Sequence, residues 1–256
     1  MKDSFERATP ANPAPLAPPH KPAVFVLIHG SWHGGWCYQR VSELLRAQGH
    51  RVYAPSLTGL ADRSHLLSPT IGLQTHVDDV VNLVKWEDLD EVVLCGHSYG
   101  GMVITGAVEM LEGRIKSLVY LDALVPDAGK SVLDYATAAS KARYEALALA
   151  AGGGYLAPIP AAAFSVNEKD SAWVDAQCTL QPYQTFRDSL PAVTVRDRIA
   201  RKYYVLAEKY ASETMAGFAE QRRSLPDWTV IDLPYGHDLM VDAPEHVADI
   251  LLQAAA

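Results

Sequence analysis

Short runs of consecutive apolar residues alternate along the chain with segments of helical spacing. Three runs, at 23–28, 91–96 and 115–122, are rich in valine, leucine and isoleucine. Such runs are typical of strands buried on both faces, as in a parallel sheet. Helical segments of about 10–15 residues between strands indicate βαβ units. The sequence therefore predicts an α/β fold, with a mostly parallel, twisted sheet and helices on both faces.

The same pattern predicts the other elements. Further strands are expected at 51–54, 202–207 and 228–233, and helices up to Gly49 and at 75–86, 98–111, 131–151, 213–223 and 244–256. Between Asp122 and the strand at 202, the stretch 123–198 is rich in alanine and proline and shows no clear strand periodicity. We interpret it as a helical cap inserted over the carboxyl edge of the sheet.

Composition limits the domain count and the class of partner. With 256 residues, of which 49% are hydrophobic, the chain can build one sizeable core. Residues 1–22 hold six prolines and are expected to form a disordered tail, which leaves 23–256 as a single domain. The net charge of −8, without a basic run, argues against nucleic acid or anionic lipid as a partner.

Cysteine usage and hydropathy suggest a location. The three cysteines, Cys37, Cys95 and Cys178, are far apart and give no metal-ligand spacing. A sparse, odd count fits a reducing compartment. No secretory signal and no apolar run of membrane-spanning length is apparent. We expect a cytoplasmic protein that needs no metal or cofactor.

The strongest chemical signal is Gly96-His97-Ser98-Tyr99-Gly100, which matches G-x-S-x-G. It follows a buried strand and precedes a helix, as a nucleophile elbow requires. The turn is so tight that only glycine fits two residues before and after the serine. Ser98 is therefore predicted to be a nucleophile held above the sheet in a strained conformation.

A serine hydroxyl needs a base that accepts its proton. His237 follows the last predicted strand, so its loop returns to the edge of the sheet where Ser98 points. We predict that His237 is the general base. His29 and His33 are expected to shape the loop after the first strand, whereas His20, His50, His65, His76 and His246 are expected at the surface.

Two backbone N–H groups are expected to bind the oxyanion. Tyr99 follows the nucleophile at a helix N-terminus, where its N–H faces developing negative charge. The second donor should come from the glycine-rich loop after the first strand. We assign it to the N–H of Ser31.

The sequence resembles the α/β-hydrolases, and within them the group of plant methylesterases and hydroxynitrile lyases. The matching stretches are 25–36, 96–101, 124–127 and 236–237, and the similarity covers about 23–253. Residues 94–105 and 117–126 look most like bacterial members, which include carbamate-ester hydrolases that act on benzimidazole fungicides. The resemblance implies an α/β-hydrolase fold with a serine-histidine-acid triad.

Two positions distinguish the esterase branch from the lyase branch. The pattern typical of the lyases has threonine directly after the loop histidine and lysine directly after the catalytic histidine. Here these positions hold Gly30 and Asp238. Because lysine would stabilise a cyanide leaving group and Asp238 would repel it, both residues favour ester hydrolysis.

The triad acid is left open by the sequence. The plant esterases carry an aspartate after the penultimate strand, and the histidine spacing places Lys209 there. Two substitutes are available, and each would have to reach the second nitrogen of His237. We prefer Asp122, which ends a strand at the carboxyl edge without flanking charge, over Glu208.

These residues predict a serine hydrolase that cleaves a carboxylic ester or carbamate ester of a small hydrophobic substrate through an acyl-enzyme. A mostly apolar pocket is expected, lined by Trp32, Leu124, Val125, Phe164, Trp173, Leu239 and Met240. Alternatives are lyase-type or cofactor-free chemistry on the same fold, and a small-molecule receptor that retains the triad. The sequence does not decide whether the protein is a homodimer.

Overall fold

The computed structural model describes residues 21–256. Except for its last two residues, the predicted tail at 1–22 lies outside the described part of the chain. None of the helices within 21–256 combines the length and the apolar character needed to cross a membrane.

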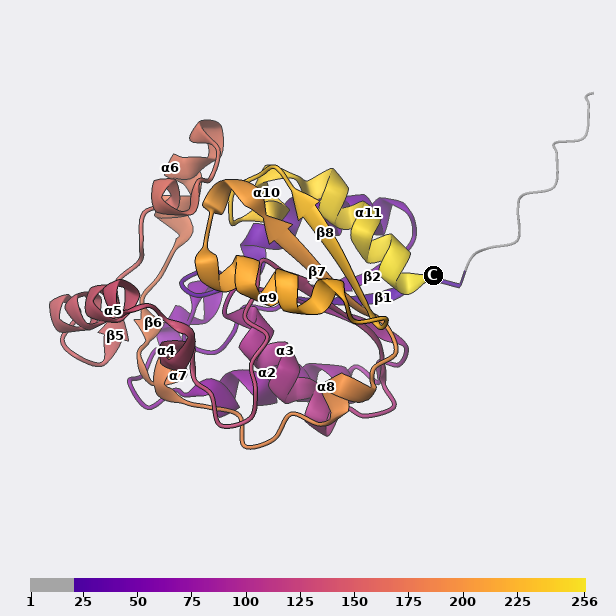
Figure 1. The fold of residues 1–256 in the computed structure, drawn as a ribbon, viewed down its shortest axis with the longest axis horizontal. Coiled ribbons are helices and arrows are strands. Elements are labelled where there is room, and N and C mark those ends of the chain that lie inside the picture. Colours follow the sequence, from indigo (N-terminus) through magenta and orange to yellow (C-terminus); the bar gives the residue numbers. More distant parts are fainter. Residues whose placement is uncertain (1–20) are drawn as a thin grey trace, which may run out of the picture.

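A six-stranded parallel sheet forms the centre of the molecule (Figure 1), in the order β2-β1-β3-β4-β7-β8. All of its strand pairings are parallel. Every residue of β1 and β3 is buried, as expected for strands covered on both faces. The predicted α/β fold is confirmed. The strands are β1 (Val24–Ile28), β2 (Arg51–Tyr53), β3 (Val92–His97), β4 (Ile115–Leu121), β7 (Lys202–Ala207) and β8 (Trp228–Leu233).

Helices cover both faces of this sheet (Figure 1). They are α1 (Gln39–Ala47), α2 (Leu73–Trp86), α3 (Gly100–Met110), α9 (Glu213–Arg223), α10 (Leu239–Asp242) and α11 (Pro244–Ala255). Helix α2 packs against α3, and α1 packs against α11. The valine stripe of α2, which predicted the helix, is buried: Val77, Val80, Val81 and Val84.

The strand order reverses between β1 and β3. These strands pair in register, and Ile28 lies opposite Gly96 at their carboxyl ends. The chain leaves β1 toward β2 on one side and leaves β3 toward β4 on the other. Loops that diverge in this way leave a crevice at the carboxyl edge, where ligands bind in open α/β sheets. The loops after β1 and β3 are those that carry Ser31 and Ser98.

The segment between β4 and β7 forms a separate group of short elements, most of them on the left of Figure 1. They are α4 (Val132–Tyr135), α5 (Ala138–Ala150), β5 (Tyr155–Leu156), α6 (Glu168–Gln177), β6 (Gln181–Pro182), α7 (Gln184–Arg187) and α8 (Val195–Arg198). Four short 3-10 helices complete the chain: η1 (Gly35–Tyr38), η2 (Ala61–Leu66), η3 (Ala161–Phe164) and η4 (Glu208–Tyr210).

The prediction of one helix at 131–151 is wrong. Ala136 is extended, with φ −76° and ψ 138°, and separates α4 from α5. Thr137 then caps a new helix, because its side chain accepts a hydrogen bond from the N–H of Ser140. The sequence also gave no sign of the antiparallel pair β5–β6, since each strand has only two residues.

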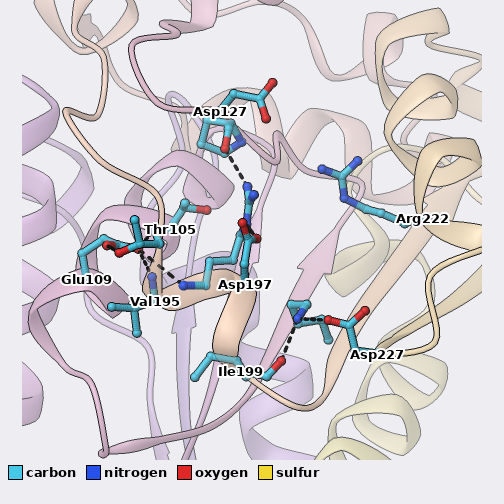
Figure 2. A network of polar contacts seen from close by, with 12 residues as sticks. Thr105, Glu109, Asp127, Val195, Asp197, Ile199, Arg222 and Asp227 are labelled. Carbon is cyan, nitrogen blue, oxygen red and sulfur yellow. Dashed lines mark hydrogen bonds and ion pairs between the residues drawn. The ribbon is translucent and has the colours of Figure 1, made fainter.

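The end of this segment is attached to α3 by a carboxylate. Glu109 on α3 accepts hydrogen bonds from the N–H groups of Thr194 and Val195, at 2.8 and 2.7 Å, and from the Thr194 hydroxyl at 2.9 Å (Figure 2). Arg196, one residue further, donates to the carbonyl of Pro126 at 2.6 Å. Because α3 starts at Gly100, two residues after Ser98, these bonds link the return of the segment to the helix that follows the predicted nucleophile.

We expect Glu109→Ala to lower the free energy of unfolding by about 1–2 kcal/mol, because it leaves the first N–H groups of α8 without their acceptor. Chemical denaturation followed by circular dichroism measures the change. Glu112→Ala is the control, two residues beyond the end of α3, since its ion pair with Arg198 is exposed on both sides and should contribute less than about 1 kcal/mol. Equal losses in the two variants would contradict this assignment.

Candidate active site

The turn between β3 and α3 holds Ser98 in a left-handed backbone conformation, with φ +53°. A Cβ atom on Gly96 would lie 2.6 Å from the carbonyl oxygen of Gly100, and one on Gly100 would lie 2.6 Å from that of Ile28. No side chain fits at either position. The local sequence therefore imposes the strained turn, which directs the Ser98 hydroxyl away from the sheet.

Three side chains from different loops form a chain of hydrogen bonds. The Ser98 hydroxyl lies 2.9 Å from Nε2 of His237. Nδ1 of the same ring lies 2.6 Å from a carboxylate oxygen of Asp122. Since the carboxylate only accepts, Nδ1 carries a proton and Nε2 is free to accept from the serine. This is the order of contacts that a serine-histidine-acid triad requires.

Asp122 is fixed in place by its own backbone. It directly follows β4, is fully buried and has φ +40°. Its N–H donates to the carbonyl of Val205 at 2.7 Å, and its second carboxylate oxygen accepts from the N–H of Ala207 at 3.1 Å. Asp122 is thus bonded to two buried residues at the carboxyl end of β7.

The other candidate acid lies elsewhere. Glu208 and Lys209 are exposed residues of η4, the 3-10 helix that follows β7. Lys209 places its ammonium group 6.0 Å from the centre of the Tyr235 ring. Of the two carboxylates that the sequence offered, the structure brings Asp122 to His237 and leaves Glu208 facing solvent.

Aromatic rings flank the imidazole of His237. The ring centre of Tyr210 lies 4.4 Å from that of His237, and the ring centre of Phe164 lies 5.4 Å away at an angle of 29°. Burial raises the pKa of Tyr210 to about 12, so its phenol stays neutral. The two rings restrict the rotation of the imidazole and exclude water from its faces.

The two predicted oxyanion donors lie beside Ser98. Ser31 and Tyr99 both line the same cavity as the serine hydroxyl. Within residues 21–256, the backbone N–H of neither residue is assigned a hydrogen-bond acceptor. Tyr99 is the residue before α3, so its N–H belongs to the positive end of the helix. Both groups are available to an oxygen atom bound at Ser98.

A cavity of about 90 Å³ opens onto Ser98 and His237. Trp32, Leu124 and Phe164, predicted to line the pocket, do so. The other four are not among the described lining residues. Val125, Leu239 and Met240 are buried in the core, and Trp173 packs edge-on against Trp36, with ring centres 5.0 Å apart. Their proximity to the site along the chain does not bring their side chains into the cavity.

The cavity contains more hydroxyl groups than the predicted apolar pocket. Residues that sequence reasoning did not assign to it are Val132, Tyr135, Ala136, Ser140, Tyr144, Phe186, Tyr210, Ser212, Thr214 and Met215. Several of these are the scattered aromatic residues of the segment between β4 and β7, which was the available signal. Among the described residues, none that lines the cavity carries a formal charge.

His76 is not at the surface, contrary to the prediction. It is fully buried on α2, where Nε2 donates to the carbonyl of Thr58 at 2.9 Å and Nδ1 accepts from the Tyr99 hydroxyl at 3.0 Å. Burial lowers the pKa of His76 to about 4, so the ring is neutral. In residues 21–256, no group of three or more histidine, cysteine or acidic side chains is arranged to hold a metal ion.

A parallel sheet, a strained serine after its central strand and a histidine–aspartate pair define a class of hydrolytic fold. A family model described as the alpha/beta hydrolase family matches residues 25–250. The chain belongs to this family, as the sequence motifs predicted.

Similar proteins are found among bacterial and plant hydrolases. The chain is 39% identical over 237 residues to a carbendazim hydrolyzing esterase of Nocardioides sp. (strain SG-4G), covering 90% of this chain and 98% of that protein. It is 38% identical over 105 residues to methylesterase 1 of Arabidopsis thaliana, which covers 40% of each chain. The sequence similarity to this plant protein therefore covers less than half of its length.

Solved structures show the same fold. An extracellular α/β-hydrolase from a Paenibacillus species, described as sharing structural and functional homology with tobacco salicylic acid binding protein 2, superposes with a TM-score of 0.78 and 25% identity, covering 91% of this chain and 99% of the other. A pyrethroid hydrolase from Sphingobium faniae JZ-2 gives a TM-score of 0.71 at 21% identity, covering 92% and 98%. At that identity the second match shows the fold alone.

We expect Gly96→Ala to lower the free energy of unfolding by about 1–3 kcal/mol, because the new methyl group overlaps the backbone of Gly100. Gly217→Ala is the control, since a Cβ there meets no atom within 4 Å. In the interior of α9 it should stabilise the protein by up to about 1 kcal/mol. Denaturant titrations of both variants measure the contrast, and an unaffected Gly96→Ala protein would contradict the tight turn.

Proposed function

We propose that this protein is a serine hydrolase that cleaves a carbamate ester or carboxylic ester of a small, uncharged, hydrophobic substrate. The observation that carries the proposal is the continuous chain of hydrogen bonds from Ser98 through His237 to Asp122, at 2.9 and 2.6 Å. The similarity to a carbendazim hydrolyzing esterase, over nearly all of that protein, supports the same conclusion.

The geometry supports an acyl-enzyme mechanism. Ser98 attacks the carbonyl carbon while His237 accepts its proton, and Asp122 stabilises the imidazolium that forms. The N–H groups of Ser31 and Tyr99 bind the oxyanion of the tetrahedral intermediate. His237 then donates the proton to the leaving alcohol or amine, and later activates the water molecule that releases the acyl group.

The cavity favours a neutral substrate. With no formal charge on its described lining residues, it offers an ionised substrate no compensating partner. The faces of Trp32, Phe186 and Tyr144 suit a flat, apolar group, while the tyrosine, serine and threonine hydroxyls can bind a polar atom of a carbamate or ester. An aromatic carbamate combines these features.

Lyase chemistry is the main alternative, and the position of Gly30 argues against it. A Cβ atom at Gly30 would lie 2.9 Å from Cβ of Ser98 and 2.8 Å from Nδ1 of His97, so the threonine of the lyase pattern does not fit. The sequence argument from Asp238 needs correction, however. Asp238 is fully buried, is ion-paired with His33 and is not among the described lining residues, so it would not face a leaving group.

The receptor alternative and the cytoplasmic location remain predictions from the sequence, which leaves open whether the protein is a homodimer. A receptor that retains the triad would bind a ligand tightly and turn it over slowly. Turnover therefore separates it from an esterase.

We expect Ser98→Ala to abolish hydrolysis of p-nitrophenyl acetate and of aryl methylcarbamates, because the variant lacks the nucleophile. A loss of at least about 10³-fold in kcat is expected. The assay compares the wild type and Ser98→Ala on esters, carbamates and mandelonitrile. Cyanide release from mandelonitrile without ester hydrolysis would favour the lyase. Tight ligand binding with negligible wild-type turnover would favour the receptor.

We expect Asp122→Asn to lower kcat by about 10³–10⁴-fold, because an amide no longer stabilises the imidazolium or selects the tautomer of His237. Glu208→Gln should keep near wild-type kcat, since that carboxylate is exposed and makes no contact with His237. Steady-state kinetics on one ester substrate measure both. The reverse order of effects would assign the acid to Glu208.

A further inference from the structure

His33 is a buried histidine whose two ring nitrogens both face oxygen acceptors. Nδ1 lies 2.7 Å from the carbonyl oxygen of Ser31, and Nε2 lies 3.0 Å from a carboxylate oxygen of Asp238. A carbonyl oxygen has no proton to give, so Nδ1 must be the donor. If Asp238 is ionised, Nε2 must also donate, and His33 is an imidazolium.

The charge balance places the proton on His33. Burial alone would lower the pKa of His33, but the attraction of Asp238 and the two hydrogen bonds together raise it above its usual value. Burial alone would likewise raise the pKa of Asp238. The positive charge and hydrogen bond of His33, with smaller contributions from His97 and His237, bring it below its usual range. The pair is therefore a carboxylate with an imidazolium.

Two neighbouring histidines show the contrast. Nε2 of His29 accepts a hydrogen bond from the N–H of Leu57 at 3.0 Å, and burial lowers the pKa of His29 to about 3. Nε2 of His97 donates to the carbonyl of His237 at 3.0 Å, while its Nδ1 has no hydrogen-bond partner among residues 21–256. Burial also lowers the pKa of His97. Both rings are neutral, and His33 differs from them in having two acceptors.

The pair connects two parts of the proposed machinery. His33 holds the carbonyl of Ser31, whose own N–H is a proposed oxyanion donor. Asp238 directly follows His237, the proposed base. Neither His33 nor Asp238 is among the described residues that line the cavity. The ion pair thus joins the loop after β1 to the loop after β8.

We propose that His33 and Asp238 form a permanent buried imidazolium–carboxylate pair that holds the Ser31 oxyanion donor in place relative to His237. Both are positioning residues, since they act through their neighbours. The proposal rests on the proposed function in one respect: it takes Ser31 and His237 as parts of a hydrolytic site. Whether His33 carries two protons is independent of that function.

The protonation state can be measured directly on the wild-type protein. In ¹⁵N NMR spectra of protein labelled at histidine, we expect both ring nitrogens of His33 to be protonated at pH 7–8. The spectrum of His33→Asn assigns the signals by their disappearance. His29 and His97 serve as internal references with one bare nitrogen each. A bare nitrogen on His33 at pH 7 would overturn the proposal, whatever the enzyme's activity.

Asp238→Asn tests the effect on catalysis. Without the carboxylate, burial lowers the pKa of His33, which then loses a proton at lower pH than in the wild type and keeps only one of its two hydrogen bonds. We expect kcat to fall roughly 10- to 100-fold with little change in KM, because the donor is displaced rather than removed, and removal typically costs about 10²–10³-fold. The deficit should grow as the pH rises, because the doubly protonated ring exists only at lower pH.

The surrounding titratable groups do not mimic this effect. Asp238 is faced by three histidines (His33, His97 and His237), by the thiols of Cys37 and Cys178 and by the phenols of Tyr38 and Tyr210, and His33 also faces His29. Burial raises the pKa of the thiols and phenols and lowers that of His29 and His97, so these six groups keep their charge state around neutral pH. His237 is present in both enzymes, so the comparison between them isolates the effect of the substitution.

The double variant His33→Asn/Asp238→Asn separates positioning from simple charge balance. It removes both buried charges, so we expect its Tm to recover relative to His33→Asn, which leaves Asp238 unpaired. One asparagine amide cannot reach both Ser31 and residue 238, so kcat should remain low. Recovery of kcat together with Tm would overturn the positioning role. A failure of the proposed function would instead appear as activity retained in Ser98→Ala.

Discussion

The turn at Ser98 is the constraint on which the site depends. Three backbone carbonyls pack closely around it. They belong to Ile28 in β1, to Gly100 in α3, and to Leu124 in the loop after β4. A Cβ atom on Gly101 would meet the carbonyl of Leu124. A side chain on any of the three flanking glycines would push these elements apart. The serine therefore stands where three strand ends meet, and its position follows from backbone packing rather than from its own contacts.

The placement of the acid follows from the same sheet. His97 pairs with Leu121 across β3 and β4, and the N–H of Ser98 donates to the carbonyl of Leu121 at 3.2 Å. Asp122, the next residue, is thus set beside the elbow by strand register alone. Because Asp122, directly after β4, supplies the carboxylate, the loop after β7 does not need to supply an acid. There the chain carries Lys209, which points to solvent, and Tyr210, whose ring lies on the imidazole.

Features encoded within a few residues could be predicted from the sequence, and features that depend on distant packing could not. The apolar runs and the glycines of the elbow are local patterns, so the sheet and the strained turn could be predicted from the sequence. The surface position predicted for His76 is wrong. The adjacent Val77 marks the apolar face of α2, but the buried hydroxyl that His76 binds belongs to Tyr99, on another element, and no local pattern reveals it. Leu239 and Met240 were chosen for the cavity because they follow His237, but α10 turns them into the core. Tyr210 and Met215 reach the cavity only through the arrangement of strands and the loops after them.

The two buried aspartates have different tasks, because each is bonded to a different histidine. Asp122 accepts from Nδ1 of His237, which leaves Nε2 free to accept the proton of Ser98. Asp238 instead accepts from Nε2 of His33, whose Nδ1 donates to the carbonyl of Ser31. One carboxylate thus orients the proposed base, and the other acts through His33 on the backbone that carries the proposed oxyanion donor.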